Sequence, residues 1–216
     1  MAGVKDIIVK PIKPSVANEF VKKHHYSGKV VPNSQLHFGC FLNGVLGGVM
    51  QFGPSLKKNA MINIVKDTGW NDFLELNRMA FGDLLPKNSE SRCISVAIRL
   101  IKKNYPNIKW IVSFADGCQC GDGTIYRASG FKLTQIQKNT QMRINPTTNE
   151  PMQAMQAFHL GKEKEFRQWK ALDGNMLRYI YFIDKSKEKD LTVPILPFSK
   201  IAEMGACMYK GKAYTK

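Results

Sequence analysis

The residues best suited to chemistry follow an apolar run in the middle of the chain. Residues 110–115 have the composition of a buried strand, and the run ends at Asp116. A glycine-rich turn follows at 121–124, and residues 125–129, which include Tyr126, are predicted to form a short helix. Ligands of open α/β sheets bind at the carboxyl ends of strands, so this carboxylate could accept a proton or hold a metal ion. An Asp-Gly turn and a core tyrosine are the plainer interpretation of the same pattern.

A second candidate group lies where the first predicted helix ends. Residues 16–24 have the spacing of an amphipathic helix with Ser15 as its N-cap, and His25 and Tyr26 follow it directly. His25 could act as a base near neutral pH, or bind a metal together with Asp116 and the Tyr26 oxygen. Histidines at a helix end also complement the helix dipole, which is the plainer interpretation. The four histidines of the chain lack short metal-site spacings, so a metal site would have to assemble from distant segments.

Two further segments carry groups that bind anions. Arg78 lies in the alternating run 73–79, and its guanidinium suits a phosphate of DNA or of a cosubstrate. A surface pair with Glu75 or Asp83 is the alternative. The polar loop before the next predicted helix is a candidate cofactor-binding loop, because free N–H groups at a helix N-terminus bind anions. Its candidate residues are Lys87, Asn88, Ser89, Ser91 and Arg92.

The charge balance predicts a polyanionic partner. The chain has 32 Lys and Arg against 17 Asp and Glu, a net charge of +15. The basic residues are spread along the whole chain, so the globular body itself is expected to bind double-stranded DNA. Charge alone does not identify the chemistry, because a purely structural nucleic-acid-binding protein has the same surplus. The candidate DNA contacts are Arg78, Arg99, Lys102 and Lys103.

Cysteine usage and hydropathy indicate the compartment. Five scattered cysteines, an odd number, predict free thiols in a reducing cytoplasm and no structural zinc. No apolar run reaches the length of a transmembrane helix, and the N-terminus lacks the apolar core of a signal peptide. We therefore expect a cytoplasmic protein without a membrane partner.

The predicted elements form one α+β domain over residues 1–216, a three-layer α/β arrangement with a mixed, mostly antiparallel sheet. Asn43-Gly44 between two apolar runs is the strongest local signal, because it favours the tight turn of a β-hairpin. Residues 186–216 are expected to be a basic, proline-containing extension that packs on the domain. The predicted strands are residues 7–12, 35–42, 45–52, 73–79, 110–115, 132–137 and 178–183. The predicted helices are residues 16–24, 92–104, 125–129 and 162–172, with a polar loop at 139–151 and an irregular apolar segment at 192–198.

This order of elements is that of the GNAT acyltransferase fold, in which the loop before the central helix holds a pyrophosphate. The loop 87–92 departs from the usual R/Q-x-x-G-x-G/A signature by lacking both glycines. Short motifs within residues 5–185 also resemble, in their order, the Mom family of phage DNA-modification proteins. They are His24-His25-Tyr26-Ser27, Glu75-Leu76-Asn77-Arg78, Pro86-Lys87-Asn88-Ser89-Glu90-Ser91-Arg92, Ser113-Phe114-Ala115-Asp116 and Gly123-Thr124-Ile125-Tyr126.

The resemblance implies a GNAT-fold transferase that converts adenine in duplex DNA to N6-carbamoylmethyladenine and so protects phage DNA from host restriction. It implies functional roles for His25, Tyr26, Arg78, Asp116 and Tyr126. It further implies acetyl-CoA or another acyl or glycyl donor, iron as the metal, and action in the cytoplasm of a host cell.

The chemistry of adenine N6 makes demands that these residues can meet. The N6 lone pair is delocalised into the ring, so an enzyme must extrude the base, stack it on an aromatic face and accept an N6 hydrogen. Asp116 supplies an acceptor, and Tyr26 or Tyr126 supplies a stacking surface or a proton relay. Two other classes remain open, a GNAT-type acyltransferase acting on a protein or on tRNA, and a non-enzymatic DNA-binding protein.

Overall fold

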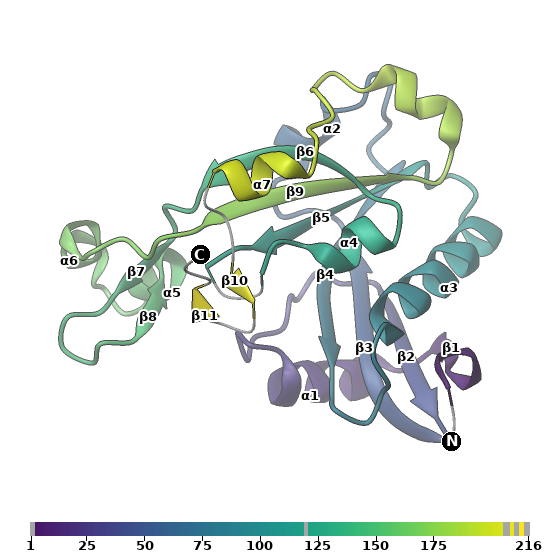
Figure 1. Cartoon of the computed structure of the whole chain (residues 1–216), viewed down its shortest axis with the longest axis horizontal. Coiled ribbons are helices and arrows are strands. Elements are labelled where there is room, and N and C mark those ends of the chain that lie inside the picture. The colour runs from purple at the N-terminus through teal and green to yellow at the C-terminus, as the bar shows by residue number, and fades with distance from the viewer. Residues whose placement is uncertain (1–2, 119–120, 205–207, 210–211, 214–216) are drawn as a thin grey trace.

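A seven-stranded sheet forms the centre of the protein in a computed structural model that describes residues 3–118, 121–204, 208–209 and 212–213 (Figure 1). The strand order is β1-β2-β3-β4-β5-β9-β6. Only β4 and β5 pair in parallel, so the predicted mixed, mostly antiparallel sheet is confirmed. The strands are β1 (Ile8–Pro11), β2 (Leu36–Leu42), β3 (Val45–Gly53), β4 (Phe73–Phe81), β5 (Trp110–Asp116), β6 (Lys132–Lys138) and β9 (Asn175–Phe182).

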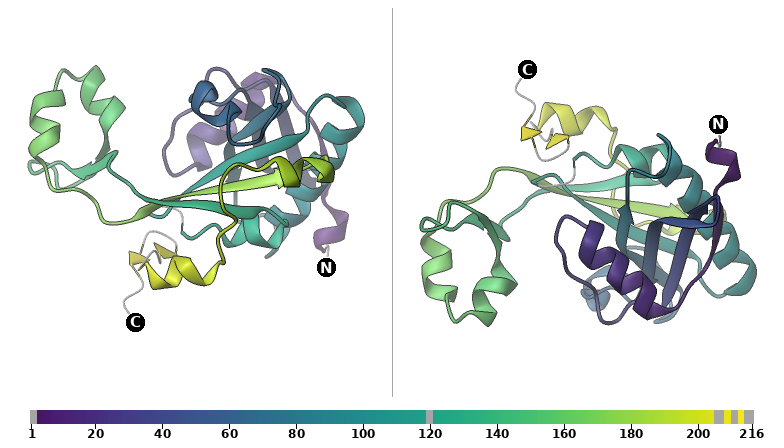
Figure 2. Two further views of the ribbon diagram at one scale, coloured as in Figure 1. Left: turned by 90° about the horizontal axis from the view of Figure 1, so that it is seen from above. Right: turned by 90° about the horizontal axis from the view of Figure 1, so that it is seen from below.

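Helices cover both faces of this sheet. On one face α1 (Pro14–His24) contacts β3 and β4, and α2 (Lys58–Ile62) packs on a second cluster around Trp110. On the other face lies α3 (Ser89–Asn104), with α4 (Thr124–Ala128) beside it (Figure 2). The apolar side of α3 faces the main core, and its residues Ile94, Ala97, Ile98 and Ile101 are all buried. Within the described ranges no helix is long and apolar enough to cross a membrane.

Shorter elements complete the fold. They are the 3-10 helices η1 (Val4–Asp6) and η2 (Lys185–Asp190), the helix α7 (Ser199–Glu203) and the hairpin of β10 (Met208–Tyr209) with β11 (Lys212–Ala213). The apolar segment 192–198 is irregular, as predicted, and packs on the domain through Leu196, whose N–H donates to the Leu133 carbonyl at 2.8 Å. Part of the predicted extension 186–216 lies outside the described residues.

Two local sequence predictions are confirmed. Asn43 and Gly44 have φ of 52° and 80°, the pair of positive values that a type I′ hairpin turn requires. The cysteines that the structure describes, Cys40, Cys93 and Cys118, are free and buried. The remaining two cysteines lie outside the described residues.

The segment between β6 and β9 differs from the prediction. Residues 139–174 form a lobe that projects from the end of the sheet (Figure 2). The lobe contains β7 (Met142–Ile144), β8 (Pro151–Gln153), α5 (Ala154–His159) and α6 (Glu163–Gln168). The predicted polar loop 139–151 was therefore wrong, because strands of three residues are too short to show an alternating pattern. The predicted helix 162–172 was too long. The backbone is extended at Trp169, directly after α6, and Ala171 forms an antiparallel β-bridge with Arg143.

The starts of two helices also differ from the prediction. The first begins at Pro14, with Lys13 in the N-cap position, because proline suits the first turn of a helix. Ser15 is thus inside the helix and is not its cap. The helix α3 begins at Ser89, three residues earlier than predicted, after Asn88 in the left-handed conformation at φ 68°.

The sheet opens between its two parallel strands. Pairing of β4 with β5 stops after Glu75 and Val112. Next to this point β4 carries one extra residue, Asn77, because Leu76 faces Phe52 while Arg78 faces Gln51. Such a bulge bends its strand and commonly lies beside an active site. The strands β4 and β5 thus diverge beyond Glu75 and Val112, which creates an opening at the carboxyl ends of both strands.

Candidate active site

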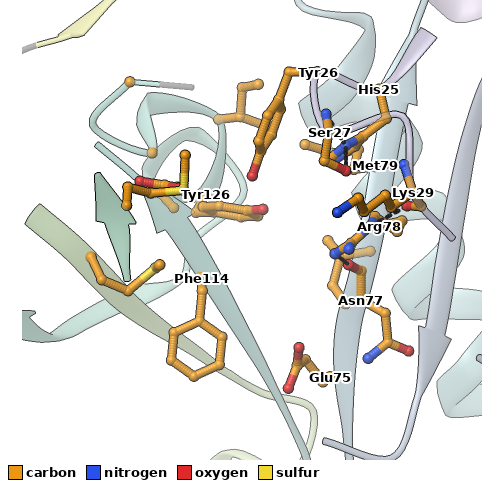
Figure 3. A pocket seen from close by; sticks show the side chains of 18 of the residues that line it. His25, Tyr26, Ser27, Lys29, Glu75, Asn77, Arg78, Met79, Phe114 and Tyr126 are labelled. Atoms are coloured by element: carbon orange, nitrogen blue, oxygen red, sulfur yellow. Dashed lines mark hydrogen bonds between the residues drawn. The ribbon is translucent and has the colours of Figure 1, made fainter. Parts of the chain in front are cut away.

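A cavity of about 490 Å³ occupies the opening between β4 and β5. Its walls come from six places in the chain: the segment after α1, the middle of β4, the end of β5, the turn leading into α4 with the start of that helix, the lobe, and the start of β9. Figure 3 shows Arg78 and His25 on one side, facing Tyr126 and Phe114 on the other, with Tyr26 above. All four residues predicted to be catalytic, His25, Tyr26, Asp116 and Tyr126, line this one cavity.

Arg78 holds the segment after α1 in place. Its Nε donates to the carbonyl of Lys29 at 2.9 Å, and its Nη1 donates to the carbonyl of Asn77 at 2.8 Å. Burial lowers the pKa of the guanidinium, and the nearby Tyr26 and Glu75 work in the opposite direction. Arg78 thus brings a positive charge to the cavity wall and fixes the backbone that follows His25. The alternative interpretation, a surface ion pair of Arg78 with Glu75 or Asp83, is not found among the ion pairs of the described residues.

His25 is held as a neutral ring. The Ser27 backbone N–H donates to its Nδ1 at 3.1 Å, and the Ser27 Oγ lies 2.8 Å from the same nitrogen. Because Nδ1 is an acceptor, the proton of the neutral ring is on Nε2. Burial, reinforced by the charge of Arg78, lowers the pKa of His25 from 6.5 to about 4. At neutral pH this residue is therefore a hydrogen-bond donor to the cavity and a weak base.

The lowered pKa of His25 predicts an acid-sensitive fold. Between pH 6.5 and 4 the unfolded chain binds a proton at His25 that the folded chain does not, so stability falls as pH falls through this window. We expect this group to contribute about 2 kcal/mol to the loss, allowing for its partial exposure. Urea unfolding at pH 7 and pH 4.5 should show a smaller acid loss in His25→Gln than in the wild type. An equal loss in both proteins would contradict the assignment.

Asp116 is buried at the end of β5, with 9% of its surface exposed. Its Oδ1 accepts the Cys118 backbone N–H at 3.0 Å and the Asn139 Nδ2 at 2.9 Å. The carboxylate is thus oriented by the turn and by the first residue of the lobe, and it lines the cavity. Burial next to Asp116 raises the pKa of the Cys118 thiol to about 12, which rules out that thiol as a nucleophile at neutral pH.

Tyr126 belongs both to the core and to the cavity. Its ring contacts Phe131 and Tyr179, at centroid distances of 5.5 and 5.2 Å, while its hydroxyl points across the cavity toward Arg78 (Figure 3). The N-cap of the helix that carries it is Gly123, where φ is +76° and a Cβ would lie 2.5 Å from the Tyr179 ring. Only glycine fits there, and this close approach fixes α4 against β9.

Glu75 is a cavity residue that the sequence did not reveal. It lines the cavity from β4, at the last position that pairs with β5. Burial raises the pKa of its carboxyl above the ordinary value, against the effect of Ser55, Asn77 and nearby cations. In the sequence Glu75 reads as a polar position of a half-buried strand, and no local signal separates it from a surface glutamate. A carboxyl with a raised pKa in a cleft is a candidate acid or base.

A model of the Mom protein family matches residues 6–200. This chain belongs to the Mom protein family. The methylcarbamoylase mom of Escherichia phage Mu is 34% identical over 200 residues, which are 89% of this chain and 82% of that protein. The resemblance inferred from the short motifs is thereby confirmed.

Solved acetyltransferase structures resemble this Mom family chain in the outline of the fold. A Bacillus subtilis acetyltransferase in complex with CoA has a TM-score of 0.48 and 12% identity, covering 82% of this chain and 97% of that one. An N-acetyltransferase from Staphylococcus aureus has a TM-score of 0.49 and 12% identity, covering 82% and 98%. A GNAT family acetyltransferase from Elizabethkingia anophelis with acetyl-CoA bound has a TM-score of 0.48 and 12% identity, covering 82% and 98%.

The metal suggested for the Mom family can be tested against the donors present. In the described part of the chain no group of three or more His, Cys, Asp or Glu side chains could hold a metal ion. The proposed set of His25, Tyr26 and Asp116 would need the Nε2 of His25, but that nitrogen carries the proton while Nδ1 accepts from Ser27. Iron binding at Nε2 would require the His25 proton to move to Nδ1, where the Ser27 Oγ at 2.8 Å can accept it. No step below depends on a metal.

The predicted cofactor-binding residues of this Mom family chain, and three of its four predicted DNA contacts, lie outside the cavity. None of the candidate cofactor residues Lys87, Asn88, Ser89, Ser91 and Arg92 is among its lining residues. The hydroxyls of Ser89 and Ser91 instead donate to the carbonyls of Pro86 and Asn88 within their own loop. Arg99, Lys102 and Lys103 are exposed on the last half of α3, which leads toward the start of β5. Asp116 is at the far end of that strand, about 20 Å from the first residue of β5.

Proposed function

We propose that this chain converts adenine in duplex DNA to N6-carbamoylmethyladenine and thereby protects that DNA from restriction. The observation that carries the proposal is the single cavity that unites a buried carboxylate, a second carboxyl with a raised pKa, two tyrosines and a fixed arginine. Its volume of about 490 Å³ lies in the range of about 300–1,000 Å³ typical of small-molecule sites. Membership of the Mom protein family supports the same reaction class.

The reacting nitrogen loses one N–H bond and gains one bond to the methylene carbon of the carbamoylmethyl group. The bond between that carbon and the donor's leaving group breaks, and the leaving group departs with the electron pair. Since its lone pair is delocalised, a carboxylate must accept the N6 hydrogen as the new bond forms. We assign this role to Asp116, whose orientation is set by two donated hydrogen bonds. Glu75, on the opposite strand, is the second carboxyl within the cavity. Tyr126 and Tyr26 supply the aromatic faces and hydroxyls around the base, and His25 donates a hydrogen bond from its Nε2–H.

The donor is a separate part of the proposal. We assign it to the CoA type, with its anionic part at the loop formed by Lys87, Asn88, Ser89, Ser91 and Arg92. The acyl or glycyl group that it carries has to reach N6 through a methylene carbon, because transfer from a thioester carbonyl would leave an amide on N6. This loop follows β4 and leads into α3, whose N-terminal N–H groups favour an anion. The reactive end would lie in the opening between β4 and β5. The loop has no glycine, so its backbone approaches a pyrophosphate less closely than in the usual signature.

The DNA partner is supported by uncompensated charge. In the described residues Lys or Arg forms an ion pair at four places, and Arg78, Arg99, Lys102 and Lys103 take part in none of them. We propose that Arg78 contacts the phosphate nearest the extruded base. The three residues on α3 would contact phosphates farther along the duplex, independently of the base sequence.

Mass spectrometry of plasmid nucleosides tests the function directly. Cells that express the chain should yield a deoxyadenosine heavier by the carbamoylmethyl group, and the plasmid should resist restriction enzymes whose sites contain adenine. Cells that carry the empty vector provide the control. If the nucleosides are unmodified while a protein or tRNA gains an acyl group, the chain is an acyltransferase of another kind. If neither changes, an enzymatic function is excluded under those conditions and a DNA-binding role is favoured.

A further inference from the structure

An exposed apolar face lies beside the mouth of the cavity. Met155, Phe158 and Leu160 are 61%, 60% and 56% exposed, although all three are large and apolar. They lie on α5 and at its C-terminal end, within the lobe. Met155 and Phe158 are three residues apart, so their side chains share one side of the helix. We call these three residues the apolar edge of the lobe.

The lobe does not need this edge for its own packing. Its interior is made by Ala157, which is fully buried, together with Phe166 and Met142, each 5% exposed. The Arg143 guanidinium lies 5.6 Å from the Phe166 ring and donates to the Trp169 carbonyl at 2.6 Å. Among the residues that the structure describes, the side of α5 opposite Ala157 is therefore left uncovered. An exposed apolar cluster of this kind indicates a binding surface.

The neighbouring residues place the apolar edge next to the reacting base. Gln153 precedes the apolar edge in the sequence, and Gln156 lies between Met155 and Phe158. Both glutamines line the cavity. Gln156 also accepts a hydrogen bond from the Lys29 Nζ at 3.3 Å, which connects the lobe to the segment after α1. Because α5 is six residues long, about 9 Å, the whole edge lies within roughly one helix length of the cavity.

The charge around the apolar edge favours a polyanion such as nucleic acid over a basic or neutral partner. Between residues 154 and 170 there are four Lys or Arg against two Glu, and Lys29 stands on the other side of Gln156. Lys162 and Lys164 are exposed just beyond the edge. Apolar side chains flanked by cations are the arrangement with which proteins enter and unstack a duplex.

We propose that the apolar edge of the lobe is a wedge that enters duplex DNA and fills the space left by the extruded adenine. The inference rests on the proposed function, because only an enzyme acting inside the duplex has to vacate a base position. Extrusion costs a few kcal/mol of lost stacking and pairing. Phe158 and Met155 would replace the lost stacking contacts on one side, while the cavity receives the adenine on the other. Lys162 and Lys164 would contact the adjacent phosphates.

The test separates base extrusion from DNA binding. A duplex copied from a plasmid stretch that the wild type modifies would carry 2-aminopurine at the modified adenine, and its fluorescence rises when the base leaves the stack. We expect a clear rise with the wild type. With Met155→Ala/Phe158→Ala the rise should fall at least fivefold, while fluorescence anisotropy shows DNA affinity within threefold of the wild type. The modified fraction of plasmid adenine in cells should fall at least tenfold.

A matched control uses exposed apolar residues far from the cavity. Trp70 and Val45 are 54% and 56% exposed and line no part of it. Trp70→Ala/Val45→Ala should keep the fluorescence rise and the activity. A full rise with the Met155/Phe158 variant, or no rise with a wild type that modifies adenine in cells, would overturn the wedge. A wild-type dimer that becomes monomeric in that variant would also overturn it, because the edge would then bind a second copy of the chain. A wild type that modifies no adenine refutes the proposed function instead, and mass spectrometry alone decides that.

Discussion

Asp116→Asn is expected to lower the modified fraction of plasmid adenine by about a hundredfold or more, the usual size of general-base catalysis. Asparagine keeps an oxygen that can accept from the Cys118 N–H and from the Asn139 amide, so the turn and the lobe connection should remain. What it removes is the anionic oxygen that takes the N6 proton. The melting temperature should therefore stay within a few degrees of the wild type, and DNA affinity should be unchanged.

Two companion variants identify what surrounds this carboxylate. Tyr126→Phe keeps the ring packed on Phe131 and Tyr179 and removes only the hydroxyl that points into the cavity. Loss of activity in both the Asp116 and the Tyr126 variants would indicate a proton relay between them. Glu75→Gln tests whether the second carboxyl is the acceptor instead. If Asp116→Asn is fully active while Glu75→Gln is inactive, the roles that we assign are reversed.

Arg78→Lys is expected to reduce the modified fraction at least tenfold although the charge is kept. The guanidinium donates in two directions, from Nε to the Lys29 carbonyl and from Nη1 to the Asn77 carbonyl. A single ammonium on a flexible stem cannot hold both carbonyls and still present a planar face to a phosphate. The segment that carries His25 and Tyr26 would lose its fixed position. The readout is again the nucleoside ratio, with DNA affinity measured in parallel.

Arg167→Lys is the matched control for this substitution. Arg167 forms an exposed pair with Glu163 at 2.6 Å on α6, and exposed pairs contribute little to stability. Its replacement should change the modified fraction less than twofold. Full activity of Arg78→Lys would show that the cavity needs only a positive charge at this position. In that case the two carbonyl bonds would have no part in catalysis.

Elements with strong local signals were predictable from the sequence. The Asn43-Gly44 turn requires positive φ at both positions, which few other dipeptides accept, so its hairpin was correctly placed. The helix α3 and the strand β5 each bury a long apolar pattern, and tertiary packing only reinforced what the pattern favoured. Asp116, as the first polar residue after a buried strand, was placed in the cavity by the same reasoning.

What the sequence did not predict depends on contacts between distant segments. Glu75 enters the site because β4 leaves β5 at that residue, a property of the sheet and not of the local pattern. The strands β7 and β8 pair with each other over three residues, so neither has a recognisable period. Arg78 was predicted to bind phosphate, but its bond to the Lys29 carbonyl joins residues 49 positions apart in the chain.

The bond between Arg78 and Lys29 has a consequence for motion at the site. The segment from His25 to Ser34 has no helix or strand, and a segment of this kind normally unfolds locally at little cost. Here it is also tied to β4 by the Ser34 Oγ, which donates to the Asn77 Oδ1 at 3.1 Å. Opening this segment therefore disturbs the bulge at the centre of the sheet. Its amide hydrogens should exchange together with those of β4, and substrate access is left to the side formed by the lobe.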